Sequence, residues 1–252
     1  MPVINKNNMN GFTLIEVAIV MLIIGVLISA AIMPLGAQRD TNNIKKVRAE
    51  LKIIEEALYG FAIANSGRLP CPAQPLSAGV EDPAGGGNCS NNSIGFVPAA
   101  TLGISGNVNC NNLLVDPWGN PYRYSVTTDD SGGIASPDFT TATDINTLGV
   151  AALNPDIRIC TTSGCGIRLT DNAVAVIFSM GKSWSTVVSA DESANAGEAT
   201  LASACTAAYD VAGDNDYVSH LPVETAGNEF DDIVTWISPN ILYAKLLAAG
   251  QL

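Results

Sequence analysis

The stretch that decides the fold is FTLIEVAIVMLIIGVLISAAIMPL, residues 12–35, in which Glu16 is the single charged residue. As an α-helix with a rise of about 1.5 Å per residue, it would be about 36 Å long, more than the about 30 Å thickness of a bilayer's hydrocarbon core. The stretch is therefore predicted to span a membrane. A cleaved secretory signal is the alternative, because Lys6 precedes the run and small residues at 29–31 lie near its far end.

Glu16 argues against the secretory signal. A carboxylate inside an apolar segment costs a few kcal/mol on insertion scales, so it needs a partner and a function that a secretory signal does not offer. The apolar run is also longer than the ordinary hydrophobic region of a signal peptide. The sequence thus favours a retained membrane segment over a removed one.

The residues around Glu16 resemble a known processing motif. GFTLIE, from Gly11 to Glu16, followed by the apolar run, resembles the class III signal of type IV pilins and type II secretion pseudopilins. The resemblance implies that a prepilin peptidase removes the leader, residues 1–11, by cutting between Gly11 and Phe12, and methylates the new amino terminus of Phe12. It also implies that Glu16 pairs with the terminal ammonium of a neighbouring subunit, which would offset the burial of both charges in an assembled filament.

A second helix signal follows the apolar run. Apolar residues recur at alternating steps of three and four, which places them on one face of an amphipathic helix: Ile44, Val47, Leu51, Ile54, Leu58 and Phe61. The pattern predicts a stem helix over 37–68, ended by Gly67 and Pro70. Together with the resemblance, this stem and the membrane segment, 12–36, form the long amino-terminal helix of a pilin. A juxtamembrane linker helix gives the same pattern and is the alternative.

Residues 69–252 are expected to form one globular head. The segment 70–116 is too rich in Pro, Gly and Asn for much regular structure. Further along, alternating or apolar runs between turn residues predict strands at Tyr122–Val126, Ile157–Cys160, Ala173–Ser179 and Ile233–Ile237. Ser238 and Pro239 then begin a terminal helix. The expected class is α+β, with the long helix packed on a small antiparallel sheet that carries long loops.

All six cysteines lie in the head. An even number confined to one region predicts disulfides and an oxidising compartment. The six are Cys71, Cys89, Cys110, Cys160, Cys165 and Cys205. Six cysteines allow fifteen pairings, and the short spacing predicts one of them, between Cys160 and Cys165. Their spacings do not match a zinc site.

A second motif supports the resemblance. DPWGNPY, from Asp116 to Tyr122, is a tight turn whose Asp and Asn bond to local backbone while the aromatic rings anchor it just before a strand. It is similar to the DPWG-x-P-Y turn of type II secretion major pseudopilins and related minor pilins. Two matches in the same order identify the chain as a member of the pilin superfamily. Its larger head and additional cysteines, compared with the commonest pseudopilin, indicate a minor, tip-located or specialised subunit.

The charge is unevenly distributed. The net charge is −12 at pH 7, and the residues contribute zero over 1–36, +2 over 37–68 and −14 over 69–252. The acidic head would repel a phosphate backbone, so nucleic acid is not an expected partner. The basic residues of 37–68 follow the apolar run, against the positive-inside rule if the head is outside the cell. The leader motif and the cysteines nevertheless place the head outside.

The sequence predicts no enzymatic activity. Its one histidine, His220, belongs to no G-x-S-x-G or triad pattern, and the Gly-Lys-Ser at 181–183 lacks the first glycine of a phosphate loop because Val176 occupies that position. A metal is the one cofactor with candidate ligands: Asp214 and Asp216 could offer oxygens to Ca²⁺. A solvated acidic loop is the alternative.

These observations define the expected setting of the chain. We expect a bacterial inner-membrane protein with one span and a periplasmic head, which then enters a periplasmic or cell-surface filament. The expected partners are other pilin or pseudopilin subunits bound through the amino-terminal helix, the prepilin peptidase, the inner-membrane assembly platform and, before assembly, the membrane. The sequence does not distinguish a type IV pilus from a type II secretion filament. Two alternatives remain: a membrane-anchored binding or adhesin module at a filament tip, and a periplasmic enzyme with a signal peptide.

Overall fold

The computed structural model describes residues 13–91, 94–127, 139–142, 144–145, 153–196 and 215–252, with the side chains of 29–35 and 37 left aside. Compactness divides the chain into two units, Met1–Ile44 and Lys45–Leu252. Helix α1, Leu14–Ala64, contributes to both units. Each unit is described by itself below.

The first unit contains the amino-terminal part of α1. Every side chain described between residues 13 and 28 is exposed, and most of them are apolar. Among the residues that the structure describes, no helix combines the length and apolarity needed to cross a membrane. Residue 12 and the side chains of 29–35, which belong to the span expected from the sequence, lie outside the described part.

Helix α1 ends where the sequence places a stop signal. Its last residue is Ala64, and Gly67 follows with a left-handed backbone (φ +87°) whose N–H donates to the carbonyl of Ala62 at 2.8 Å. Asn65 donates its side-chain amide to the carbonyl of Phe61 at 2.8 Å. These bonds satisfy carbonyls that the last helical turn would otherwise leave open, as glycine-terminated helices commonly do.

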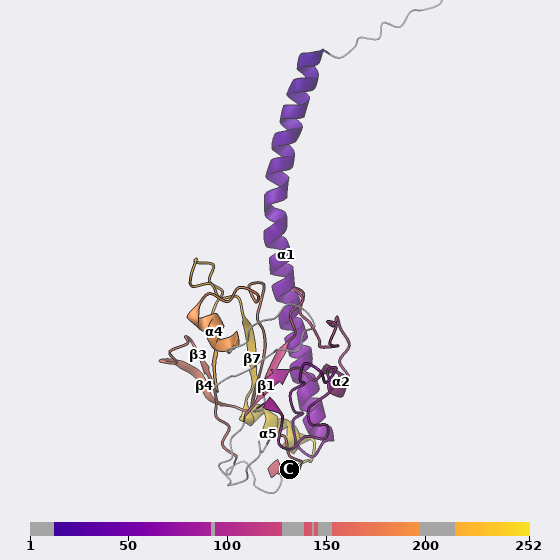
Figure 1. Ribbon diagram of the computed structural model, residues 1–252, viewed down its shortest axis with the longest axis vertical. Coiled ribbons are helices and arrows are strands. Elements are labelled where there is room, and N and C mark those ends of the chain that lie inside the picture. The colour runs from indigo at the N-terminus through magenta and orange to yellow at the C-terminus, as the bar shows by residue number, and fades with distance from the viewer. Residues whose placement is uncertain (1–12, 92–93, 128–138, 143, 146–152, 197–214) are drawn as a thin grey trace, which may run out of the picture. The chain divides into compact units, whose positions relative to one another are not determined.

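The second unit is built on a four-stranded antiparallel sheet (Figure 1). Its order is β1-β2-β5-β7, with the strands Ile94–Phe96, Arg123–Val126, Ala175–Ser179 and Ile233–Ile237. A smaller sheet has the order β4-β3-β6, formed by Arg168–Ala173, Ile157–Cys160 and Asp216–Val218. The pair β3–β6 is parallel, whereas every other pair of strands in these two sheets is antiparallel. Three helices complete the described part of this unit: α2 at Ala99–Leu102, α4 at Ala190–Ala196 and α5 at Pro239–Ala248.

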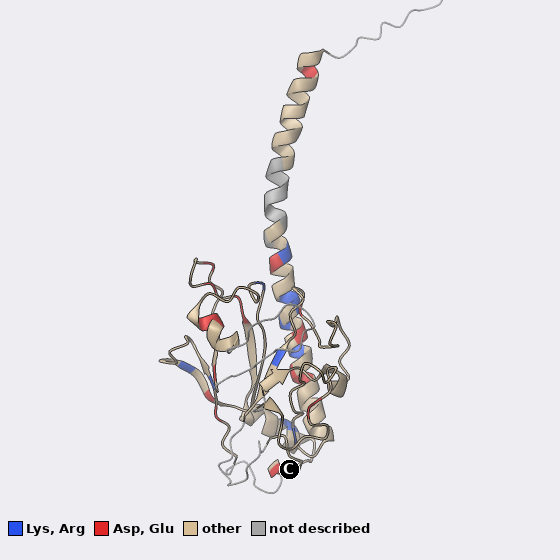
Figure 2. Cartoon of the chain, in the orientation of Figure 1, with Lys and Arg blue, Asp and Glu red and all other residues tan. Residues whose placement is uncertain are grey.

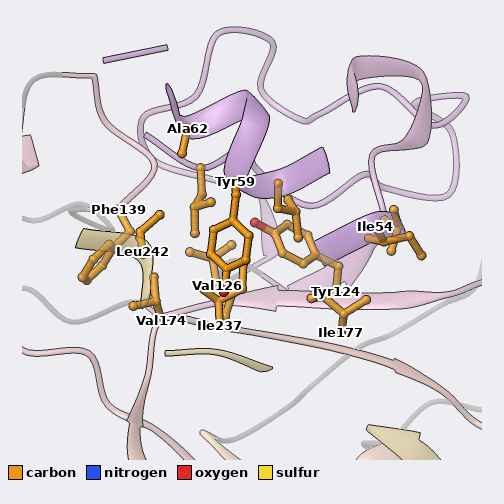
Figure 3. Close-up of a cluster of buried hydrophobic side chains, with 14 of the residues drawn as sticks. Ile54, Tyr59, Ala62, Tyr124, Val126, Phe139, Val174, Ile177, Ile237 and Leu242 are labelled. Atoms are coloured by element: carbon orange, nitrogen blue, oxygen red, sulfur yellow. The ribbon is translucent and has the colours of Figure 1, made fainter. Parts of the chain in front are cut away.

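Strand β5 explains why the second unit has three layers. Successive side chains of a strand point to opposite faces, and all five residues of β5 are buried. On one face, Ala175 and Ile177 pack in a cluster with α1 and α5, which Figure 3 shows around Tyr59, Tyr124 and Leu242. On the other face, Val176 and Phe178 pack against residues of the smaller sheet. A continuous apolar run is the expected sequence of a strand covered on both sides.

The amphipathic stripe of α1 occupies the predicted position. Val47, Leu51, Ile54 and Leu58 are at most 3% exposed and belong to the main core. At about 25 cal/mol per Å² of apolar surface, each such side chain stabilises the fold by about 1.5–3 kcal/mol. The predicted packing of the helix on an antiparallel sheet is therefore confirmed, and so is the α+β class.

The strand predictions differ from the structure at two points. The ranges Ile157–Cys160 and Ile233–Ile237 agree to the residue, and the strand predicted at Tyr122–Val126 begins one residue later than predicted, at Arg123. The predicted strand Ala173–Ser179 is wrong as a single element, because Ala173 ends β4 in the smaller sheet and Ala175 begins β5 in the larger one. The chain changes sheets at Val174, whose N–H donates to Ile237 and whose carbonyl accepts from Thr127.

Two sheet edges in the described part are closed by other segments. Ala73 exchanges two backbone hydrogen bonds with Phe96 of β1, at 2.8 and 2.9 Å. The side-chain amide of Asn195 in α4 both donates to and accepts from the backbone of Val218 in β6, at 2.9 and 2.7 Å. Strand β4 has four exposed residues and contacts only β3 among the described strands.

Candidate functional site

The processing motif begins helix α1 with a capping arrangement. The carboxylate of Glu16 accepts hydrogen bonds from the backbone N–H and the hydroxyl of Thr13, both at 2.9 Å, and the Thr13 hydroxyl accepts from the N–H of Glu16 at 3.3 Å. This is a capping box, in which an amino-terminal Thr and a Glu three residues later satisfy each other's N–H groups. Within the described part of the chain, Glu16 contacts only Thr13. The cleavage residues Gly11 and Phe12 lie outside that part.

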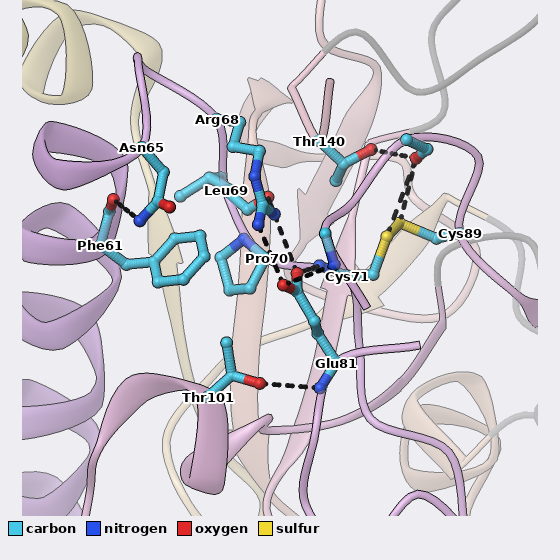
Figure 4. Close-up of polar contacts among 12 residues, drawn as sticks. Phe61, Asn65, Arg68, Leu69, Pro70, Cys71, Glu81, Cys89, Thr101 and Thr140 are labelled. Atoms are coloured by element: carbon cyan, nitrogen blue, oxygen red, sulfur yellow. Dashed lines mark hydrogen bonds and ion pairs between the residues drawn. A yellow bond between two sulfur atoms is a disulfide. The ribbon is translucent and has the colours of Figure 1, made fainter. Parts of the chain in front are cut away.

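After α1, the loop is fixed by a buried ion pair (Figure 4). Arg68 donates two parallel bonds to Glu81, both at 2.9 Å, and the side chains are 8% and 6% exposed. Glu81 also accepts from the N–H groups of Cys71 and Gly85 at 3.1 Å. The guanidinium lies 4.8 Å from the ring centre of Phe61 on α1. The pair therefore connects the end of the helix to the middle of the loop.

Both partners of this pair are satisfied, which the burial requires. Burial by itself would raise the pKa of Glu81, but the hydrogen bonds from Arg68 and from the two N–H groups, together with the Arg68 charge, hold it below its usual value. Gly86 has a left-handed backbone (φ +77°), and a side chain there would collide with the carbonyl of Thr140 and the guanidinium of Arg68. We call Arg68 and Glu81 the loop lock. Sequence reasoning missed it, because Arg68 and Glu81 are 13 positions apart in a loop that gives no periodic signal.

The disulfides pin two different loops. Cys71 and Cys89 are bonded across the segment that contains Glu81 (Figure 4). Cys160 and Cys165 are bonded across the turn between β3 and β4, which confirms the one pairing that the sequence predicted. Cys110 is also disulfide-bonded, and Cys205 lies outside the described residues.

The DPWGNPY turn connects the sheet to α1. The buried carboxylate of Asp116 accepts from the N–H groups of Trp118 and Asn120 at 2.9 Å and from the hydroxyl of Ser179 at 2.6 Å. Burial raises the pKa of Asp116 despite these bonds. At the end of the turn, the hydroxyl of Tyr122 donates to Glu50 of α1 at 2.5 Å. The turn therefore sets the position of the sheet on the helix.

Of the two candidate calcium ligands, Asp214 and Asp216, the structure describes only Asp216. Asp214 lies outside the described residues. Asp216 forms a bidentate ion pair with Arg158, directly across the β3–β6 register. Its carboxylate is close to Cys160 and Cys165, but a disulfide offers no thiolate to a metal. The donor set around Asp216 therefore does not fit a cation, and its described role is to hold two strands together.

A second acidic region surrounds Lys182 and Ser183. We define the acidic side as Glu192, Glu229, Asp231 and Asp232. Asp231 accepts from the N–H groups of Lys182 and Ser183 at 2.8 and 3.0 Å, and the Ser183 hydroxyl contacts both Asp231 and Glu192. Burial and neighbouring carboxylates raise the pKa of Asp232, which accepts from Asn195 at 2.7 Å. Burial also raises the pKa of Glu192.

His220 packs between helix α4 and the segment 221–230. One ring nitrogen lies 3.2 Å from Asp191 of α4 and the other 2.7 Å from the carbonyl of Leu221, while the ring stacks on Phe230 at 3.9 Å. Asp191 also accepts from the N–H of Ser163 in the β3–β4 turn at 2.7 Å. The histidine therefore contributes to a contact between α4 and that turn.

The amino-terminal sequence matches a known family model. Residues 6–32 match the prokaryotic N-terminal methylation motif. Over 120 residues, 47% of this chain and 75% of the relative, it is 30% identical to type II secretion system core protein G of Pseudomonas aeruginosa. The same protein of Klebsiella pneumoniae is 31% identical over 113 residues, and that of Vibrio cholerae is 29% identical over 139 residues. The matched part covers 71% of the first and 79% of the second, and 45% and 55% of this chain. No solved structure matches the fold significantly.

A long capped helix packed on an antiparallel sheet, with a methylation motif at its start, defines a pilin-like subunit. The chain belongs to the pseudopilin family of type II secretion core protein G. Members of that family are structural proteins, so the prediction that the chain is not an enzyme is confirmed. It is longer than these relatives, since 120 matched residues already make up 75% of the first one.

Proposed function

We propose that this chain is a subunit of a type II secretion filament, cleaved between Gly11 and Phe12 and methylated at Phe12. The observation that carries the proposal is the methylation motif over 6–32 at the start of a capped helix whose described side chains at 13–28 are all exposed. An apolar helix surface of this kind is stable only in a bilayer or against other helices. Residues 1–11 would be the leader and 12–36 the segment that inserts and then packs in the filament.

In this proposal Glu16 acts between subunits. Its described contacts are local, to Thr13, on a helix surface that is otherwise apolar. Burying that surface in a filament would bury the carboxylate too, and a buried carboxylate needs a cation. The ammonium of a neighbouring subunit's Phe12 would supply that cation once the leader is removed.

The remaining parts follow from this arrangement. Residues 37–68 would form the stem and 69–252 the periplasmic head. The inner membrane would hold the chain before assembly. The partners would be the prepilin peptidase, the inner-membrane assembly platform and the other pseudopilins of the filament. The disulfides of the head support an oxidising compartment such as the periplasm.

A second function, binding at the filament tip, is supported by the size of the head. The chain exceeds its relatives in length, and the disulfide-bonded turn of the smaller sheet leads to two exposed apolar residues, Ile167 and Leu169. Such residues on a rigid turn suit a contact with another protein. This role is compatible with the structural one, because a tip subunit still enters the filament through its amino-terminal helix.

Mass spectrometry of the amino-terminal peptide, isolated from the native membrane fraction, tests the proposal. We expect a mature chain that begins with methylated Phe12. The variant Gly11→Ala should insert in the membrane but keep its leader, since the peptidase reads the residue before the cut. Glu16→Val should be processed but should enter filaments poorly, whereas the control Thr13→Ala retains the carboxylate and should enter normally. A chain that begins after residue 35 would contradict the proposal.

A further inference from the structure

Helix α5 is apolar on its outer side as well as on the side that faces the core. Its inner side is buried in the main core, and its only charged or amide side chains are Lys245 and Asn240. On the outer side, Ile241, Ala244 and Ala248 follow one another at steps of three and four and are all exposed. A helix that is apolar all round is normally covered on every side. We call Ile241, Ala244 and Ala248 the α5 stripe, and it has no such cover in the described part of the chain.

The α5 stripe borders an open groove of about 380 Å³ between α5 and α1. Lys245 and Ala248 line the groove from α5, and Glu56 and Gly60 line it from α1. A side-chain carbon placed on Gly60 would meet no atom within 4 Å, so this wall is free. Ile53, three residues before Glu56 on the same face of α1, is 57% exposed. Small residues on both walls allow the backbone of a further helix to approach closely.

The charges of this surface are already neutralised within the chain. Lys245 binds Glu56 at 2.9 Å, and its ammonium lies 4.5 Å from the ring centre of Tyr59. Lys245 is also the single charged residue of the segment 233–252. An apolar partner would therefore meet no unpaired side-chain charge on the stripe or in the groove.

The charge distribution of the head makes the α5 stripe suitable for a second copy of the same chain. Residues 69–252 contribute −14, and Figure 2 shows acidic residues over several elements of the head. Two such heads repel each other at contact distance unless they meet at surfaces without net negative charge. None of the carboxylates of the acidic side belongs to α5, and the segment 233–252 contains no acidic residue. Two copies can thus approach each other along α5 without this repulsion.

We propose that the α5 stripe of one chain packs on the α5 stripe of a second copy, with the groove beside it receiving the flank of the partner's helix. Such a contact uses the same patch on both chains, so it closes on itself and pairs two heads without extending a filament. The apolar area that each stripe hides from water stabilises the pair. The inference goes beyond the proposed function, because a contact between heads needs neither the cut after Gly11 nor a filament.

Two other apolar partners fit the α5 stripe less well. Helices that lie on a membrane surface typically carry several basic residues that bind anionic headgroups, whereas the one cation of α5, Lys245, is paired with Glu56. The amino-terminal helix of another copy is apolar as well. In the proposed function, however, that helix is occupied by the bilayer and then by the other amino-terminal helices of the filament. The α5 stripe of a second copy has neither conflict.

Cysteine crosslinking of the full chain in cells tests the contact directly. Two differently tagged copies that both carry Ala244→Cys are expressed together, and the membrane fraction is treated with an oxidant and separated without a reducing agent. We expect a disulfide-linked pair that contains both tags. The matched control is Ala226→Cys, which places a cysteine at an exposed alanine of the head outside α5. The crosslinked fraction should be at least about tenfold higher for Ala244→Cys, the ratio that about 1.4 kcal/mol of contact energy gives.

A charge placed in the stripe provides the second measurement. Adding Ile241→Glu to Ala244→Cys puts a carboxylate on each side of the contact and should lower the crosslinked fraction at least about tenfold. The control Leu221→Glu makes a similar change at a leucine that is 81% exposed outside α5, and it should leave the fraction unchanged. Thermal unfolding of each purified chain, followed by circular dichroism, reports whether the variant is folded. Ala248→Glu, at an exposed small residue, replaces Ile241→Glu if that variant is not.

The outcomes separate this inference from the proposed function. Equal crosslinking of Ala244→Cys and Ala226→Cys would overturn the inference, and so would pairing that Ile241→Glu does not weaken. If Ala244→Cys joins a copy that carries Met21→Cys rather than a second Ala244→Cys copy, the groove receives the amino-terminal helix and the inference is wrong. In each of these cases, a mature chain that begins with methylated Phe12 and enters filaments leaves the proposed function intact. If the chain pairs through α5 but keeps its leader, the proposed function is wrong and the inference stands.

Discussion

Glu81 and Asp232 are both buried carboxylates of the head, but their surroundings are opposite. Glu81 is clamped by two bonds from Arg68 and two backbone N–H groups, and its pKa lies below the usual value. Asp232 accepts from the amide of Asn195 amid other carboxylates, with Arg123 acting only as a weaker influence, and its pKa lies well above the usual value. Glu81 is thus held ionised by a cation within the chain, whereas burial and neighbouring carboxylates disfavour the ionised form of Asp232.

The difference follows from the structure around each residue. The loop lock stands in a segment with little regular structure, so ion pair and disulfide must replace the backbone ladders that hold a sheet. Asp232 immediately precedes strand β7, and Asn195 belongs to α4, so regular elements already fix their positions. The backbone around Asp232 is therefore held by regular elements rather than by an ion pair.

Breaking the loop lock should have the largest effect on stability. In Glu81→Ala, the guanidinium of Arg68 stays buried without its partner, which typically costs about 3–5 kcal/mol. Denaturant unfolding of the full chain in detergent, followed by tryptophan fluorescence, measures the loss. The control Glu224→Ala removes an exposed carboxylate and should change the free energy of unfolding by less than about 0.5 kcal/mol. A loss below about 1 kcal/mol for Glu81→Ala would contradict the role of the lock.

Removing the disulfides one at a time should distinguish the two loops. The Cys71–Cys89 bond closes 18 residues and the Cys160–Cys165 bond closes 5. The chain-entropy relation gives about 3 kcal/mol for the first and about 2 kcal/mol for the second. Paired Cys→Ser variants, compared with the wild type by the same unfolding measurement, should follow that order. The reverse order would show that the turn between β3 and β4 contributes more to the fold than its length indicates.

Neutralising Asp232 should act in the opposite direction to Glu81→Ala. Asp232→Asn keeps the shape and an oxygen that can accept from Asn195, while it removes a charge whose ionised form is disfavoured by burial. The free energy of unfolding at pH 7 should therefore rise, by about 1 kcal/mol, the size of an ordinary single-residue effect. Thermal unfolding by circular dichroism checks the direction. A destabilised Asp232→Asn chain would mean that the charge itself is needed.

The pH dependence should show the same contrast on a smaller scale. Because the folded-state pKa of Asp232 is raised, its contribution to stability increases as pH falls through that pKa towards about 4, the unfolded value. Because the folded-state pKa of Glu81 is lowered, its contribution is lost only as pH falls below about 4.3. Asp232→Asn should therefore abolish the gain in stability that the wild type shows as pH falls from 7 towards 4, and Glu81→Gln should flatten the loss below pH 4. Stability profiles of the two variants that coincide would refute this assignment.

Local patterns predicted more of this fold than of its charged contacts. The helix stop at Gly67, the stripe from Val47 to Leu58 and strand β7 depend on neighbouring residues, and the structure confirms each of them. The change of sheet at Val174 was missed because an unbroken apolar run gives no signal where one strand ends and the next begins. The boundary is set by strand pairing: Ala173 pairs with β3 and Ala175 pairs with β2 and β7, and the local sequence does not show these partners.

The charged contacts could not be predicted from the spacing of residues in the sequence, because they depend on which strands pair. Arg158 and Asp216 are 58 positions apart and meet because β3 and β6 pair in parallel, a topology that the predicted antiparallel sheet did not include. Asp216 was therefore interpreted as a candidate metal ligand. The amino-terminal motif was different: six consecutive residues, from Gly11 to Glu16, suffice for its recognition, and the family model matches the same segment.

The covered edges at β1 and β6 limit how the heads of neighbouring molecules can associate. Exposed strand edges can template intermolecular backbone pairing and so lead to aggregation. Ala73 occupies the edge of β1, and the amide of Asn195 uses both the donor and the acceptor of Val218 on β6. Heads that approach each other along these edges cannot extend a sheet, so contacts there depend on side chains. Such side-chain contacts can be broken and re-formed without changing the fold of either head.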